Sequence, residues 1–327
     1  MSDAPGQRFA PRQSPPADLP ASRPGRLALS VLLVGVAWGV MYALYPIGLA
    51  RSGPVWLAAL RFDAFLVGAL GVALLRRTPL RPSGWRDWAA IAAYGGLNVV
   101  LHNVLLMAGS QHVPIAAVAI ATGLNPLLTL GLARLALPGI RLSAGAIAGF
   151  AVALSGVALL ALQGDSNGGA IDWRWALVVL GGVLAWASGS VAMKASGSRL
   201  PPLALAVWGS LAGAVALQAG AFAVEPLPRI DAAYLGVVAF AGLVGGLGAF
   251  LLWGGIVRDF GPQRANLASY VSPVAASLTA WVLLDQPPRL AHAAAYVLVA
   301  LGLTLSLAPA RPAAAAPGMP PPPAAPE

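Results

Sequence analysis

Long apolar runs alternate with short polar connections along most of this chain. Ten runs of about twenty residues lie between residues 27 and 308. A helix of that length and composition is long enough to cross the hydrocarbon core of a bilayer. We therefore predict ten transmembrane helices, over residues 27–50, 54–75, 88–110, 113–133, 142–162, 174–195, 202–224, 233–254, 264–284 and 290–308.

Both ends of the chain lack this apolar pattern. Residues 1–26 are rich in proline, serine, alanine and arginine, and residues 309–327 are mainly alanine and proline. Such segments do not bury enough apolar surface to fold, so both are predicted to be disordered tails. The first apolar run has no obvious small-residue cleavage site, so we expect a retained helix and not a removed signal peptide.

The composition excludes several classes of protein. Hydrophobic residues make up 58% of the chain and charged residues only 9%, which leaves no hydrophilic surface for a soluble domain. There are no cysteines, so disulfides, thiolate metal sites and cysteine nucleophiles are excluded. We expect no cofactor and no metal. No nucleotide-binding motif is present, so ATP is not expected to drive the protein directly.

The basic residues indicate how the helices are oriented. The net charge of +9 comes from residues spread between the apolar runs, which argues for membrane topology and against a nucleic-acid partner. With the N-terminus inside, fifteen of the 20 basic residues are cytoplasmic; the others are Arg61 within a span and Arg51, Arg174, Arg229 and Arg289 outside. Both termini are therefore predicted to be cytoplasmic.

The two halves of the chain resemble each other at a shift of about 148 residues. Three landmarks coincide under this shift: an Ala-Trp pair, a proline that opens a span and a proline within a span, namely Trp38 with Trp186, Pro54 with Pro202, and Pro126 with Pro273. An odd number of spans in each half makes the halves enter the membrane from opposite sides. The predicted fold is thus all-α, with two inverted five-helix repeats over residues 27–163 and 174–308, an architecture that recurs in transporters.

Short motifs in several spans resemble those of one known family. They are Ala37-Trp38-Gly39, Ala59-Leu60-Arg61-Phe62, Asn125-Pro126-Leu127, Leu184-Ala185-Trp186, Ser272-Pro273-Val274 and Leu283-Leu284-Asp285. On these motifs the chain is similar to the EamA family of the drug/metabolite transporter superfamily, from about residue 28 to 308. Asp285 stands where that family commonly has glutamate, a conservative departure. The resemblance implies a bacterial inner-membrane permease, often an exporter of amino acids and related metabolites.

Polar and aromatic residues recur at helical spacing in five of the spans. Polar groups in hydrocarbon are costly, so we expect them to face a central cavity lined by the first, third, fourth, sixth and ninth spans, with one tryptophan from the eighth. The candidate lining residues are Trp38, Tyr42, Tyr94, Asn98, His102, Thr122, Asn125, Trp186, Ser190, Trp253, Ser269, Tyr270 and Ser272.

Pro126 and Pro273 are candidate helix breaks. Proline within a helix removes a donor and displaces the carbonyl four residues earlier, here that of Thr122 or Ser269. In one interpretation, the displaced carbonyl binds a substrate ammonium group or a water molecule. In the other, neighbouring groups satisfy it and the prolines only shape the helices.

Three ionisable residues within the spans are candidates for a functional role. In one interpretation, His102 forms a hydrogen bond to the substrate or acts as a protonation switch. In the other, it is a neutral ring that bridges two helices. Arg61 either extends towards the outer surface or pairs across helices and gates the outer side. Asp63, two residues further along the same helix, points to a different face and is the candidate for proton coupling.

These features favour a transporter in the lipid bilayer that exports small metabolites, amino acids first, by alternating access. Broad drug efflux is the alternative. An intramembrane enzyme is a distant alternative, because no catalytic constellation is present, and a membrane scaffold is another. Glycine pairs such as Gly242 and Gly246 permit close helix packing, either within the chain or in a homodimer.

Overall fold

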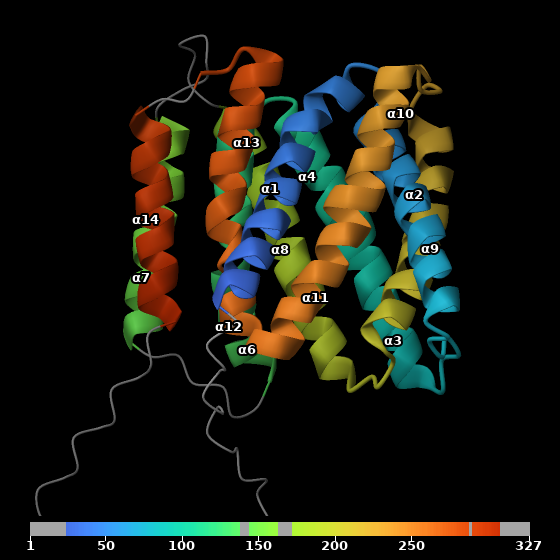
Figure 1. Cartoon of the computed structure of the whole chain (residues 1–327). Helices are drawn as coiled ribbons and strands as arrows, with labels where there is room; N and C mark the ends of the chain where they lie inside the picture. Colours follow the sequence, from blue (N-terminus) through green and yellow to red (C-terminus); the bar gives the residue numbers. More distant parts are fainter. Residues whose placement is uncertain (1–23, 138–143, 163–171, 288–289, 308–327) are drawn as a thin grey trace, which may run out of the picture.

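The computed structural model describes residues 24–137, 144–162, 172–287 and 290–307, and all regular elements in these segments are helices (Figure 1). The first half contains α1 (Pro24–Leu49), α2 (Pro54–Leu75), α3 (Trp85–Ala93), the π-helix η1 (Tyr94–Leu101), α4 (His102–Ser110), α5 (Ile115–Thr122), α6 (Asn125–Ala136) and α7 (Ala144–Leu162). The second half contains α8 (Trp173–Ser196), α9 (Pro202–Val224), α10 (Ala232–Ala239), the π-helix η2 (Phe240–Gly248), α11 (Ala249–Phe260), α12 (Pro262–Ala265), α13 (Ala268–Leu284) and α14 (Leu290–Leu307).

The helices coincide with the ten predicted spans to within a few residues, apart from the eighth, which continues to Phe260. Among the described residues, seven helices are long and apolar enough to cross a membrane. The fifth, ninth and tenth spans contain shorter apolar stretches, over Ile147–Gly156, Ala268–Leu284 and His292–Gly302. The chain is thus an all-helical membrane protein. Most of the two predicted tails lies outside the described residues.

The third and eighth spans each contain a π-helical segment, which the sequence pattern did not predict. η1 and η2 begin at Tyr94 and Phe240, a separation close to the shift that relates the two halves. A π-helix has a wider turn and leaves some carbonyls without their usual partners. In the third span, Asn103 Nδ2 donates to the carbonyls of Asn98 and Val99, each at 2.9 Å. One side chain therefore stabilises the irregular turn.

The fourth span is broken at its middle. α5 ends at Thr122, a turn follows, and α6 begins at Asn125 with Pro126 in its first turn. Proline is well tolerated there because the first helical amides have no partner within the helix. In the ninth span, Pro273 lies inside α13, and the turn comes earlier, at residues 266–267. The two prolines thus have different structural roles, although they match in the repeat.

Helices of the two halves pack against each other and do not form separate lobes. α1 packs on α13 and α8 on α6, α2 packs on α9, and α7 lies beside α14 at one edge of the bundle (Figure 1). α1 and α13 belong to the first and ninth spans, and α8 and α6 belong to the sixth and fourth. A shift of five spans therefore relates the α1–α13 pair to the α8–α6 pair. Small residues allow the close approaches: a Cβ added to Gly39 of α1 would lie 2.7 Å from the Ala276 amide of α13.

Candidate functional site

Arg61 of α2 lies inside the bundle, with only 7% of its surface exposed. Its Nη1 donates to the Tyr45 hydroxyl of α1 at 2.5 Å and to Asn103 Oδ1 of α4 at 2.8 Å. The guanidinium carbon also lies 4.7 Å from the centre of the Phe62 ring and 5.9 Å from that of Tyr45. The side chain of Arg61 therefore does not extend to the outer surface. It contacts neighbouring helices instead, and its partners there are the neutral side chains of Tyr45 and Asn103.

No carboxylate forms an ion pair with Arg61 in the part of the chain that the structure describes. The ion pairs there involve Arg26, Arg51 and Arg258. Arg61 Nε is buried and has no hydrogen-bond partner among these residues. Removing an arginine from water without an anion costs several kcal/mol, of which ring faces and neutral acceptors recover only part.

Aromatic side chains of α1 and α2 lie next to this arginine. Tyr42 and Tyr45 of α1 meet edge to face, with their ring centres 5.8 Å apart. Tyr94 of η1 packs against Gly209 of α9, and the His102 ring of α4 lies beside Trp186 of α8. Of these predicted lining residues, the structure places Tyr42 next to Tyr45, a partner of Arg61, whereas Tyr94 and His102 are directed at helices of the second half.

His102 and Asn98 connect the third span to α8. His102 Nδ1 donates to the Gly182 carbonyl at 2.8 Å, and its ring centre lies 5.0 Å from that of Trp186. Asn98 Nδ2 donates to the Trp186 carbonyl at 3.0 Å. A carbonyl only accepts, so Nδ1 carries a proton and Nε2 is the remaining acceptor of a neutral ring. This is the geometry of the bridging interpretation, and it leaves Nε2 without a hydrogen bond among the described residues.

The hydroxyls of Thr122 and Ser190 are used within their own helices. Thr122 donates to the Ala119 carbonyl at 2.8 Å, and Ser190 donates to the Trp186 carbonyl at 2.9 Å. Other predicted lining residues keep a buried polar atom with no partner among the described residues: Asn98 Oδ1, Asn125 Oδ1, Tyr270 Oη and Ser272 Oγ. Buried polar atoms of this kind call for a water or a ligand.

The remaining predicted lining residues are Trp38, Trp253 and Ser269, all partly buried. Trp253 of α11 packs in an apolar cluster with Val31, Val34 and Ile256, apart from the Arg61 group. Trp38 touches both this cluster and the main core. Both tryptophans therefore pack against the same apolar cluster, and Trp38 also reaches the main core.

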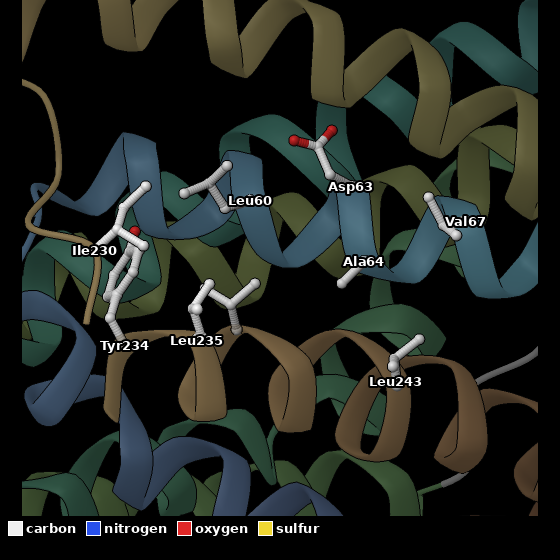
Figure 2. A pocket seen from close by; sticks show the side chains of 9 residues that line it. Leu60, Asp63, Ala64, Val67, Ile230, Tyr234, Leu235 and Leu243 are labelled. Carbon is white, nitrogen blue, oxygen red and sulfur yellow. The ribbon is translucent and has the colours of Figure 1, made fainter. Parts of the chain in front are cut away.

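Asp63 lies on another face of α2 from Arg61. Gln218 Nε2 of α9 donates to both of its carboxylate oxygens, at 2.9 and 2.8 Å. A pocket of about 370 Å³ lies beside Asp63 and is lined almost entirely by apolar side chains of α2, α10 and η2, together with Ile230. Figure 2 shows the carboxylate directed away from Tyr234, Leu235 and Leu243 on the far wall. Tyr45, Phe62 and Asn103, which contact Arg61, do not line this pocket, so it is separate from the Arg61 group.

Sequence reasoning missed the role of Asn103. It follows His102 directly, so it points to a different face of the helix from the predicted polar stripe. Its amide group joins the carbonyls of the π-helical turn before it to Arg61. Tyr45 was not among the predicted lining residues either, although it continues the spacing of Trp38 and Tyr42 along the first span.

Polar contacts join the loops at both ends of α2. At its start, Glu225 accepts from the amides of Val55 and Trp56, both at 2.9 Å, and Arg51 Nε donates to Asp231 at 2.7 Å. The Tyr234 amide, with the Arg51 guanidinium beside it, holds the pKa of Asp231 below its usual range. Beyond the other end of α2, Asp87 accepts from the hydroxyls of Ser83, at 2.8 Å, and Ser198, at 2.6 Å. Each set of contacts ties a loop of the first half to a loop of the second.

The sequence matches the EamA-like transporter family twice, over residues 26–162 and 173–308. The chain belongs to this family. The resemblance seen in the short motifs is therefore confirmed, and the protein is a transporter and not an enzyme.

Several relatives are similar over most of their length. The chain is 32% identical to the "Uncharacterized inner membrane transporter YedA" of Escherichia coli over 254 residues, 74% of this chain and 78% of that protein. It is 30% identical to the "Probable terminal-alkyne amino-acid exporter" of Streptantibioticus cattleyicolor, covering 80% of this chain and 87% of that one. It is 24% identical to the "Probable amino-acid metabolite efflux pump" of E. coli, covering 84% and 93%.

A solved structure titled "Crystal structure of protein" has the same fold. It superposes with a TM-score of 0.64, covering 86% of this chain and 98% of its own, at 23% sequence identity. The names of the relatives and the apolar helices agree on a multi-pass protein of the inner membrane.

Proposed function

We propose that this protein is a secondary exporter of amino acids or closely related zwitterionic metabolites. The observation that carries the proposal is the group of aromatic and polar side chains buried among α1, α2, η1 and α4, with buried polar atoms that no described residue satisfies. Aromatic faces suit the apolar part of a small amphipathic solute, and unsatisfied polar atoms suit its charged ends. Two relatives support the same substrate class: one is named a probable terminal-alkyne amino-acid exporter and the other a probable amino-acid metabolite efflux pump.

The packing of the halves supports alternating access as the mechanism. We propose that the two five-helix repeats are inverted, with both termini in the cytoplasm and the substrate near the repeat interface. The π-helices at repeat-related positions and the packing of α1 on α13 and α8 on α6 are what such a relation predicts. Pseudo-symmetry of this kind offers two conformations of similar energy, open to opposite sides.

The loop contacts suggest which interactions change during transport. Glu225 and Arg51 join loops at one end of α2, and Asp87 joins loops beyond the other end. In the proposed mechanism, the contacts at one end of α2 break while those beyond the other end stay formed, and the two ends alternate. The driving force is a gradient of the solute, of protons or of an exchanged solute, because the chain carries no nucleotide-binding motif.

Counterflow in proteoliposomes tests the proposal. The purified full chain is reconstituted and exchange is measured for a panel of amino acids and nucleosides, with ethidium as a probe of drug efflux and protein-free liposomes as the control. We expect saturable exchange of amino acids. Exchange of ethidium alone would instead establish drug efflux, and binding without flux would establish a scaffold.

A matched pair of histidine variants tests whether the solute binds near His102. His102 is buried beside Trp186, whereas His112 is exposed and stacks on Trp175 with ring centres 3.8 Å apart. His102→Ala is expected to lower amino-acid exchange and His112→Ala to leave it near the wild-type level. Equal exchange by both variants would restrict His102 to bridging helices.

A further inference from the structure

We propose that Arg61 binds the carboxylate of the transported solute. This inference rests on the proposed function and makes it more specific, because it assigns one side chain to one chemical group. Only 7% of the surface of Arg61 is accessible.

The pattern of hydrogen bonds on the guanidinium identifies the vacant edge. Both partners of Arg61, the Tyr45 hydroxyl and Asn103 Oδ1, are bound through Nη1. Nε has no partner, and Nη2 donates no hydrogen bond to any described residue. Nε–H and one N–H of Nη2 point in the same direction, which is the edge that holds a carboxylate through two parallel hydrogen bonds.

The charge around Arg61 also favours an anion. No carboxylate of the described residues forms an ion pair with Arg61, and Asp63 is directed at Gln218 on another face of α2. The groups that do surround Arg61 are neutral hydroxyl, amide and aromatic side chains. A solute carboxylate would supply the missing negative charge.

Arginine and lysine differ in a way that distinguishes binding from simple charge balance. Lysine carries the positive charge but not the planar edge with two parallel donors. Arg61→Lys should therefore keep part of the preference for a carboxylate, and Arg61→Gln should lose it. Arg229→Gln is the matched control, because Arg229 is exposed in the loop before α10.

The test compares each amino acid with its amide. Exchange of leucine and phenylalanine, and of leucinamide and phenylalaninamide, is measured in proteoliposomes with the wild type and the three variants. We expect the wild type to prefer the acids, Arg61→Gln to lower exchange of the acids by about tenfold or more, and exchange of the amides to change by about twofold at most. Equal losses for acids and amides in Arg61→Gln, or no loss, would overturn the inference.

A second measurement separates this inference from the proposed function. The melting temperature of the detergent-solubilised full chain is followed with phenylacetate and with phenylacetamide. Stabilisation by phenylacetate alone, present in the wild type and Arg229→Gln but absent in Arg61→Gln, supports a carboxylate site even if no amino acid is exchanged. The absence of a selective effect of phenylacetate in the wild type would contradict the site even if amino acids are transported.

Discussion

Arg51 and Arg61 lie ten residues apart in the sequence and have opposite surroundings. Arg51, partly exposed at the end of the bundle, donates from Nε to both carboxylate oxygens of Asp231, at 2.8 and 2.7 Å. Arg61, buried in the middle, has no partner at Nε among the described residues. The same atom of the guanidinium is thus bound by a carboxylate of the protein in one case and left open in the other.

This difference is the reverse of what stability alone would favour. Water solvates an exposed arginine well, so a partner there adds little, whereas a buried arginine needs an anion most. A protein that leaves the buried cation without one loses stability at that site. Such a loss is typical of binding sites, where the ligand completes the interaction.

The largest effect is expected from giving Arg61 an internal anion. Asn103→Asp would place a carboxylate where Asn103 Oδ1 now accepts from Nη1 at 2.8 Å. Arg61 would then resemble Arg51, and we expect exchange of amino acids to fall by about tenfold or more. Counterflow in proteoliposomes measures the change.

Asn103→Leu is the control for this variant. Both substitutions remove the Nδ2 bonds to the carbonyls of Asn98 and Val99, so both are expected to cost about 1–3 kcal/mol of stability. Only the aspartate adds a negative charge. Equal exchange by the two variants would show that the charge of Arg61 does not matter for transport.

A smaller effect is expected from neutralising Asp63, the nearest carboxylate in the sequence to Arg61. Asn at this position keeps an acceptor for Gln218 and stays on the face of α2 away from the Arg61 group. We expect Asp63→Asn to change exchange by about twofold at most and to leave its dependence on pH unaltered. Loss of that pH dependence would instead identify Asp63 as the proton-coupling residue, which sequence reasoning proposed.

The smallest effect is expected at the exposed pair of Arg51 and Asp231. The folded state lowers the pKa of Asp231, so its carboxylate contributes stability above the ordinary aspartate value of about 3.9 and loses it as the pH falls through the lowered pKa. The difference in melting temperature between wild type and Asp231→Asn should be constant from pH 7 to about pH 4 and shrink below that.

Arg51→Gln sharpens the same comparison. The Tyr234 amide is the main cause of the lowered pKa and Arg51 a lesser one, so this variant should reproduce only part of the effect of Asp231→Asn. The part due to Arg51 should also weaken as salt is added. A larger loss for Arg51→Gln than for Asp231→Asn would contradict this order.

Much of the fold could be predicted because the requirements of a membrane-spanning helix are local. Span length follows from bilayer thickness, and the runs beginning at Pro54 and Pro202 became α2 and α9 with the same bounds. The family followed from short motifs within the spans. The polar stripe of Asn98 and His102 was predicted from spacing, and both residues point to α8.

Tertiary structure alone decided how the polar groups meet. The inward turn of Arg61, the partnership of Asn103 with it and the separate environment of Asp63 depend on which helix faces which, and the spacing of residues along one helix does not contain that information. The π-helices also depend on tertiary structure, because contacts with neighbouring groups stabilise a widened turn and local propensity does not. The sequence by itself determined where the chain crosses the membrane, because hydrophobicity and length act within each span. Packing between spans determined where its one buried cation lies within the described chain and which of its atoms remain open.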